Sequence, residues 1–257
     1  MITAGIDVGS ISTKAVIIEG GRILSAVVIG SGYNARRAGQ EALDLALKEA
    51  GLQADRIVGI VATGYGRNSV DFAHRTVTEI TCHGLGAHFL DPAVRSVIDI
   101  GGQDSKAMAL NEQGRVREFV MNDKCAAGTG RFLEVMARAL EVDLEAFGRL
   151  SLKADRPAPI SSVCTVFAES EVISLIAAGE KRENIIAGIH AAVAARVTAM
   201  ARRIALAPPT MMTGGVAKNI GVVKALEERL GHPLHVSEMA QLTGAIGAAL
   251  IMASSSS

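Results

Sequence analysis

Aromatic side chains are scarce in this sequence. Among its 257 residues there are no tryptophans, two tyrosines and six phenylalanines, whereas glycine occurs 27 times. Glycine lets backbones approach one another closely, so we expect tightly packed helices and strands. A chain of this length can bury one large core or two modest ones, because domains usually have about 100 to 200 residues.

The chain also lacks an excess of either charge, since 26 Lys and Arg residues balance 26 Asp and Glu residues. Non-specific binding to nucleic acid or to anionic membranes depends on a cationic surplus, so neither partner is expected. No uninterrupted apolar run approaches about 18 residues, and the first residues resemble a strand rather than a signal peptide. We therefore expect a cytoplasmic protein.

Cysteine is the third scarce residue, with three copies at Cys82, Cys125 and Cys164. Three cysteines are too few for the disulfide framework of a small secreted protein. The sequence favours free thiols or a metal site.

An internal repeat lies in the segments "IDVGSISTKAVII" (6–18) and "IDIGGQDSKAMAL" (98–110), which are 92 residues apart. Such a repeat is typical of duplicated domains. The matched residues are Asp7 with Asp99, Gly9 with Gly101, Thr13 with Ser105, and Lys14 with Lys106.

Both copies predict a three-stranded antiparallel meander in an α/β fold, with third strands at 23–29 and 116–121. In the first half a helix is expected at 36–50, ended by Gly51, followed by a strand at 56–64. The second half predicts a strand at 210–215 and helices at 130–142, 168–178, 184–205, 219–230 and from residue 242 onward, with Asn184 and Asn219 as N-caps.

Three glycine turns predict a phosphate-binding site. A turn of small residues exposes N–H groups and hydroxyls to an anion, while Asp7 and Asp99 would hold Mg²⁺ rather than phosphate. A single Asp-x-Gly turn is usually only a tight turn, but three together favour a nucleotide clamp in a cleft between two domains. The expected nucleotide-binding residues are Gly9, Ser10, Ser12, Thr13, Lys14, Gly101, Gly102, Gly214, Gly215, Val216 and Gln241. Gln103 is the candidate for orienting a hydrolytic water.

These turns resemble those of the superfamily of acetate and sugar kinases, actin and heat-shock chaperones, whose members have duplicated ribonuclease-H-like domains around ATP. More narrowly, "GIDVGS", "ATGYGRNS", "VIDIGGQDSK", "NDKCAAGTGRFLEVMA", "SSVCTVFAESEVIS" and "MTGGVAKN" resemble the activator component of 2-hydroxyacyl-CoA dehydratases. The broader family includes the ATP-binding subunits of benzoyl-CoA reductase. We expect domains at 1–95 and 96–253 and a disordered tail at 254–257.

Cys125 and Cys164 each precede an expected helix start, where the helix dipole stabilises anionic sulfur. Two thiolates cannot complete a four-ligand site, but a homodimer would supply four. From spacing alone, iron–sulfur, zinc, redox thiols and simple buried thiols all stay open. The resemblance implies a single [4Fe–4S] cluster that bridges two subunits and is held by both cysteines of each.

The resemblance further implies that ATP hydrolysis drives one-electron transfer to an iron–sulfur 2-hydroxyacyl-CoA dehydratase, with a reduced ferredoxin or flavodoxin as the electron source. Transfer to a benzoyl-CoA reductase or another cluster protein is an alternative. Other function classes also stay open: a small-molecule kinase with structural cysteines, or a nucleotide-gated binding module without iron.

Other motifs have ordinary structural interpretations beside functional ones. Cys82, next to His83, is expected to be a core thiol, since lone internal cysteines are usually buried. The glycine turn at 63–67 is either nucleotide-proximal or only a turn. Glu169 and Glu171 would tune a cluster or simply pair with a helix dipole.

Overall fold

The computed structural model describes residues 1–161 and 164–254, which form two compact units. Unit 1 contains Met1–Val97, Leu110–Arg117 and the C-terminal segment from Ser237, and unit 2 contains Ile98–Ala109 and Glu118–Val236. These units differ from the two contiguous domains expected from the repeat, because the last helix packs against the first strand. Of the expected tail, Ser254 ends that helix, and 255–257 lie outside the described residues.

The sheet of unit 1 has the strand order β3-β2-β1-β4-β5. The meander is antiparallel as predicted, and β4 adds to β1 in parallel. Parallel addition brings the carboxyl ends of β1 and β4 to one edge of the sheet. The strands are β1 (Ile2–Val8), β2 (Ser12–Glu19), β3 (Arg22–Gly30), β4 (Gly59–Thr63) and β5 (Arg75–Thr76).

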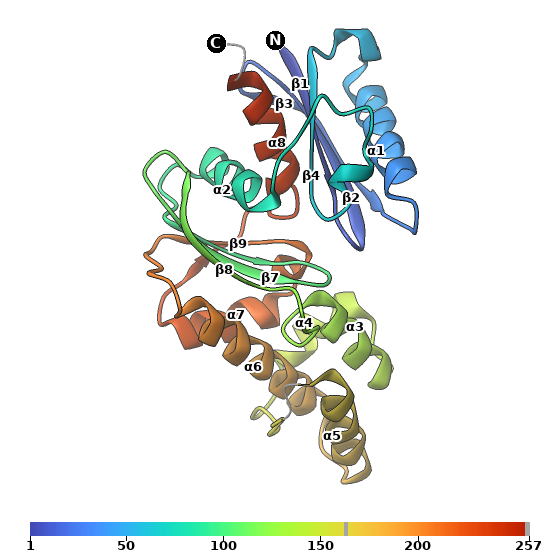
Figure 1. Ribbon diagram of the computed structural model, residues 1–257. Helices are drawn as coiled ribbons and strands as arrows, with labels where there is room; N and C mark the ends of the chain where they lie inside the picture. Colours follow the sequence, from blue (N-terminus) through green and yellow to red (C-terminus); the bar gives the residue numbers. More distant parts are fainter. Residues whose placement is uncertain (162–163, 255–257) are drawn as a thin grey trace. The chain divides into compact units, whose positions relative to one another are not determined.

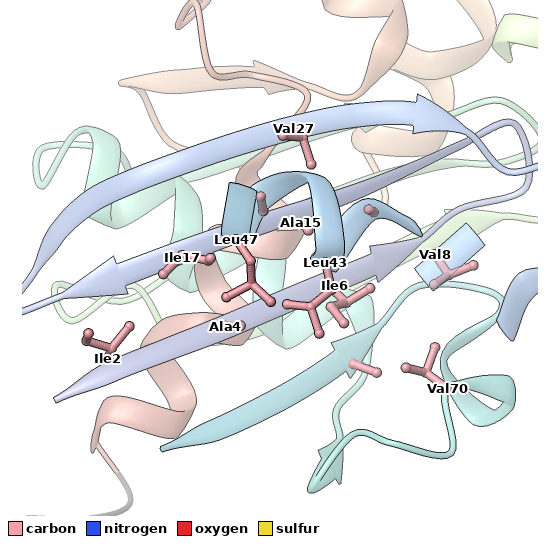
Figure 2. Packing of buried hydrophobic residues seen from close by; sticks show 13 residues of the cluster. Ile2, Ala4, Ile6, Val8, Ala15, Ile17, Val27, Leu43, Leu47 and Val70 are labelled. Carbon is pink, nitrogen blue, oxygen red and sulfur yellow. The ribbon is translucent and has the colours of Figure 1, made fainter. Parts of the chain in front are cut away.

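Helices cover both faces of this sheet (Figure 1). Helix α1 (Ala35–Ala50) lies on one face, where Leu43 and Leu47 pack on Ile6 (Figure 2). Helices α2 (Glu79–Leu90) and α8 (Thr243–Ser254) lie on the other face.

Small residues set how closely α8 approaches. A Cβ on Gly5 of β1 would lie 2.0 Å from the carbonyl oxygen of Ala245, and one on Gly247 would lie 1.9 Å from that of Cys82. No side chain fits at these distances. These glycines thus allow α8 to pack closely against β1 and α2.

Unit 2 repeats the same sheet, with the order β10-β9-β6-β7-β8, so that β6 to β10 correspond in turn to β1 to β5. Its strands are β6 (Ser96–Ile100), β7 (Ser105–Leu110), β8 (Val116–Asn122), β9 (Thr210–Thr213) and β10 (Leu234–His235). Its helices are α3 (Gly130–Ala139), α4 (Leu144–Ser151), α5 (Thr165–Ala177), α6 (Arg182–Ala201) and α7 (Ile220–Leu230). Short 3-10 turns lie at Ala54–Arg56 and Arg67–Ser69 in unit 1 and at Gly215–Lys218 in unit 2. Helices α6 and α7 lie side by side in this unit (Figure 1).

Helix ends were predicted well where a cap acts locally. Gly51 ends α1 in the left-handed conformation, and Asn219 caps α7 by accepting from the N–H groups of Gly221 and Val222. Asn184 was wrong as a cap, because α6 begins at Arg182 and the Asn184 side chain instead accepts from Asp155 N.

Two helices were not predicted, α2 and α4. In α2 the glycines at 84 and 86 resemble a turn, yet both are helical and buried. A Cβ on Gly86 would lie 2.0 Å from the carbonyl oxygen of Thr243, so this glycine serves close packing rather than chain reversal.

Helix α6 is long and apolar enough to cross a membrane by length and composition. In this structure 67% of its apolar window is buried inside the protein, and a core helix meets the same criterion.

Candidate functional site: two carboxylate–lysine turns and two cysteine loops

The first turn of unit 1 joins the ends of β1 and β2. Asp7 and Lys14 are paired residues of the two strands, and Lys14 Nζ lies 3.2 Å from Asp7 Oδ2. The Asp7 side chain is 5% exposed and that of Lys14 is 12% exposed. Lys14 therefore compensates a nearly buried carboxylate while its own side chain remains partly exposed.

Hydrogen bonds within the turn use some of the groups predicted to meet a phosphate. Gly9 N donates to Ser12 O over 3.1 Å, and Thr13 Oγ1 lies 2.8 Å from Ser31 Oγ, which itself donates to Gly9 O. Thr13 is fully buried, so it fastens β3 to the turn, and its predicted role as a ligand contact is not supported by its position. Ser10 and Ser12 are half-buried and reach the surface.

Three further segments of unit 1 surround Asp7. Gly64, with φ of +87°, lies so close that a Cβ would be 2.4 Å from Asp7 Oδ1. On the other side a Cβ on Gly244 would lie 3.0 Å from Asp7 Oδ2 and 3.3 Å from His83 Nε2. The His83 ring is held by Thr243, 2.8 Å away at Nδ1. The glycine turn at 63–67 and His83 therefore both belong to the Asp7 surroundings.

The second turn, in unit 2, has the same construction with deeper burial. Lys106 Nζ lies 3.3 Å from Asp99 Oδ2 and 2.8 Å from Asp104 Oδ1, and its side chain is 2% exposed. Thr213 donates to Asp99 Oδ1 over 2.8 Å. Both carboxylate oxygens of Asp99 thus accept hydrogen bonds from the protein, so this side chain holds the neighbouring strands together. Asp7 is therefore the better-placed of the two carboxylates for binding a cation.

The glycines of this turn are docked on the start of helix α3. Gly101 N donates to Asp104 O, while the carbonyl oxygens of Gly101 and Gly102 accept from Gly130 N and Arg131 N, each over 2.9 Å. The turn and the helix N-terminus therefore form one hydrogen-bonded body. Gln103 is exposed at the tip, in keeping with its predicted contact with water.

The third turn follows β9, where Gly214 has φ of +85° and ψ of 176°. This conformation is essentially restricted to glycine, and a Cβ here would lie 2.3 Å from Ile100 O. Gly215 is exposed and Val216 is buried. Gln241 lies in unit 1, where its Nε2 donates to Ser12 Oγ over 3.4 Å.

The three cysteines differ in how deeply they are buried. Cys82 is fully buried, and burial raises the pKa of its thiol to about 12, which confirms it as a core residue. Cys125 is half-buried in a loop five positions before α3, where its carbonyl oxygen accepts from Asn122 Nδ2. Cys164 is exposed as the N-cap residue of α5.

Helices α3 and α5 pack on each other, so the loop of Cys125 and the cap at Cys164 lead into contacting helices. Cys164 is the N-cap residue of α5, whereas Cys125 lies in the loop before α3, so the predicted dipole contact of Cys125 stays a prediction. The carboxylate of Glu171 accepts from both the backbone N and the hydroxyl of Ser161, and its role at a helix dipole or a cluster stays a prediction. Glu169 is half-buried.

The two cysteines fit a shared iron–sulfur cluster by chemistry and exposure. Thiolates are the usual ligands of such clusters, and neither Cys125 nor Cys164 is confined to the core. Within residues 1–161 and 164–254, no group of three or more His, Cys, Asp or Glu side chains could hold a metal ion.

Several residues of these turns were not predicted from the sequence. Thr213 and Gly130 act on the Asp99 turn, and Thr243 acts through His83. The sequence did contain a signal for Thr213. Strands β4 and β9 are structural equivalents, and each ends in a threonine that is followed by a glycine, at Thr63–Gly64 and Thr213–Gly214.

Known proteins resemble this chain over nearly its whole length. The model of the BadF/BadG/BcrA/BcrD ATPase family matches residues 4–252. The activator of lactoyl-CoA dehydratase from Anaerotignum propionicum is 51% identical over 251 residues, covering 97% of this chain and 96% of that protein.

Two solved structures share the fold. Component A of (R)-2-hydroxyglutaryl-CoA dehydratase from Acidaminococcus fermentans has a TM-score of 0.95 and 45% identity, covering 98% of this chain and 97% of that one. The activator of 2-hydroxyisocaproyl-CoA dehydratase from Clostridium difficile with bound ADPNP has a TM-score of 0.94 and 43% identity, covering 100% and 97%. These matches confirm the predicted α/β fold and the resemblance drawn from the motifs. The chain belongs to the BadF/BadG/BcrA/BcrD ATPase family.

Proposed function

We propose that this protein is an ATP-hydrolysing activator that transfers one electron at a time to an iron–sulfur 2-hydroxyacyl-CoA dehydratase. The observation that carries the proposal is the match to proteins named as such activators, at 43 to 51% identity over at least 94% of both partners' lengths. Identity at this level over complete chains supports a shared activity as well as a shared fold.

The nucleotide is bound by the glycine turns of Asp7 and Asp99. Lys14 is the residue that changes partner, because its side chain is partly exposed and can leave Asp7 for a phosphate oxygen. Asp7 would hold Mg²⁺, which would offset phosphate charge. Lys106 is held between Asp99 and Asp104 and keeps the second turn rigid. Gln103, exposed at the tip of that turn, orients the attacking water.

Hydrogen bonds link the nucleotide turn to the start of helix α3, which follows the cysteine loop. Gly101 and Gly102 accept from the first residues of α3, and the loop that leads into α3 contains Cys125. A shift of the turn when ATP is bound or hydrolysed therefore moves the N-terminus of α3. Helix α5, which follows Cys164, packs on α3 and receives the same displacement.

A homodimer completes the metal site. Two chains supply Cys125 and Cys164 twice, which makes four thiolates. When bound, a [4Fe–4S] cluster stores the single low-potential electron that is passed on. Helix α5 supports this association, because apolar side chains on it are exposed to 45 to 67%. These residues are Val166, Phe167, Ile173 and Ile176. The electron source in this proposal is a reduced ferredoxin or flavodoxin, and the location is the cytoplasm.

The test is ATP-dependent reduction of a purified dehydratase, followed anaerobically with Cys125→Ser and Cys164→Ser variants. Cys82→Ala is the matched control, since it also removes a thiol but one that lies in the core. We expect both serine variants to bind ATP and to lose electron transfer, and Cys82→Ala to retain it. Full transfer by either serine variant would contradict the cluster assignment.

The acceptor is tested separately by replacing the dehydratase with a benzoyl-CoA reductase core. One relative, a component of the benzoyl-CoA reductase of Thauera aromatica, is 34% identical over 260 residues, covering 97% of this chain and 92% of that protein. Faster ATP-dependent reduction of that core than of any dehydratase would redirect the proposal to this acceptor.

A further inference from the structure

A cavity of about 580 Å³ lies within unit 2, between the cysteine loops and helix α6. Asn122, Gly128 and Ser161 line one side, and Ala195 and Arg196 of α6 line the other. Its volume is within the range of about 300 to 1,000 Å³ that is usual for small-molecule sites. None of the turns described above needs this cavity for nucleotide binding.

The charge of the cavity is positive. Two arginines, Arg196 and Arg203, are among its lining residues, and no carboxylate is among those that the structure describes. Arg196 Nε is buried without a hydrogen-bond partner in the described part of the chain. A guanidinium remains protonated at any physiological pH, and a buried donor without a partner is unfavourable. An anion paired with this guanidinium would compensate its positive charge.

The remaining walls are mostly apolar, with Met121, Phe132, Val193 and Met200 among them. Apolar walls beside the two arginines suit an organic acid that has an aliphatic body, and they suit a bare oxyanion poorly. Ser105 adds a hydroxyl whose contact with the sulfur of Met200 is long, at 4.0 Å.

Arg196 is also tied to the loop of Cys125. A Cβ on Gly128 would lie 3.3 Å from Arg196 Cδ, so the side chain runs directly over this loop. Gly128 has φ of +88°, which favours glycine, and a side chain here would press on the arginine stem.

We propose that this cavity is a binding site for a small aliphatic carboxylate, with the Arg196 guanidinium as the group that pairs with the carboxylate. This site is distinct from the nucleotide turns and does not depend on the function proposed above. A ligand held there contacts the wall that carries Cys125.

The test is calorimetric titration of the purified full chain with hexanoate at low ionic strength. We expect saturable binding of one hexanoate per chain and much weaker binding of hexanol, which has the same body without the charge. Inorganic phosphate should bind at least about tenfold more weakly than hexanoate, because it gains nothing from the apolar walls.

Two variants test separately how the charge of Arg196 and the free space of the cavity contribute to hexanoate binding. Arg196→Gln should weaken hexanoate binding by at least about tenfold, the loss expected for a charge-assisted hydrogen bond. Ala195→Leu keeps the charge, fills part of the cavity and should also weaken binding. Arg182→Gln is the matched control, since it lies on the same helix about 21 Å away by helix rise and is exposed.

The proposal is overturned by any of three results: no saturable hexanoate binding, equal affinities for phosphate and hexanoate, or Arg196→Gln binding as tightly as Arg182→Gln. Circular dichroism and thermal melting of each variant show whether it is folded. Should Arg196→Gln be unfolded, an unchanged affinity in Ala195→Leu would overturn the proposal on its own.

Discussion

Gly214→Ala is the substitution that most directly probes the turn against Asp99. Gly214 has φ of +85° and ψ of 176°, a region that L-residues scarcely populate. Its new Cβ would lie 2.3 Å from Ile100 O and 3.0 Å from Asp99 Oδ1. Since the first of these atoms is backbone, the turn itself must shift.

The expected cost has two parts. Backbone strain in this region contributes about 1 to 3 kcal/mol, and forcing an atom into a packed site contributes about 1 to 3 kcal/mol more. Gly231→Ala is the control for a glycine at positive φ without a steric contact, because Gly231 has φ of +79° and ψ of 13°, in the left-handed helical region, and nothing within 4 Å of a Cβ. That control should lose only about 1 to 2 kcal/mol.

The measurements are urea unfolding and the affinity for a non-hydrolysable ATP analogue, both at fixed Mg²⁺. We expect Gly214→Ala to lose about 2 to 6 kcal/mol of unfolding free energy and to bind the analogue more weakly. Gly231→Ala should keep its affinity. Equal stabilities and equal affinities for the two variants would refute the placement of Gly214 against Asp99 and the role of its turn in nucleotide binding.

Two further predictions concern buried ionisable groups of unit 2. Lys106→Met should lower the unfolding free energy by about 3 to 5 kcal/mol, since it leaves Asp99 buried without its cation. Lys14→Met, at a partly exposed pair, should lower the unfolding free energy less. Equal losses of the two variants in urea unfolding would contradict this prediction. Burial lowers the pKa of His190 to about 3, so the folded state binds fewer protons than the unfolded state between pH 3 and 6.5, and stability falls as the pH decreases through this window. Between pH 7.5 and 5.5 the loss should be about 1.4 kcal/mol, absent in His190→Gln and unchanged in a variant of the exposed His235.

Much of the fold could be predicted because the repeat encodes it locally. The repeat at 92 residues, which matches Asp7 with Asp99 and Lys14 with Lys106, predicted the two equivalent turns, and each turn contains an Asp–Lys ion pair. Caps at Gly51 and Asn219 were predictable because they depend on the residue itself and its immediate neighbours.

Features that depend on distant contacts could not be predicted. Thr13 lies in a motif typical of phosphate contacts, yet it is buried against Ser31, the residue after β3, and does not reach the surface. Glycines in α2 resemble a break until α8 is known to lie against them. His83 stands next to Asp7 only because α2 and α8 pack on the same face of the sheet.

Anaerobic reconstitution with iron and sulfide, followed by native mass spectrometry and metal analysis on the same sample, tests the central claim most directly. The account predicts a dimer with about four irons and four sulfides per two chains, lost from both Cys125→Ser and Cys164→Ser. A folded dimer that holds zinc or no metal, or a monomer that holds a complete cluster by itself, would contradict it.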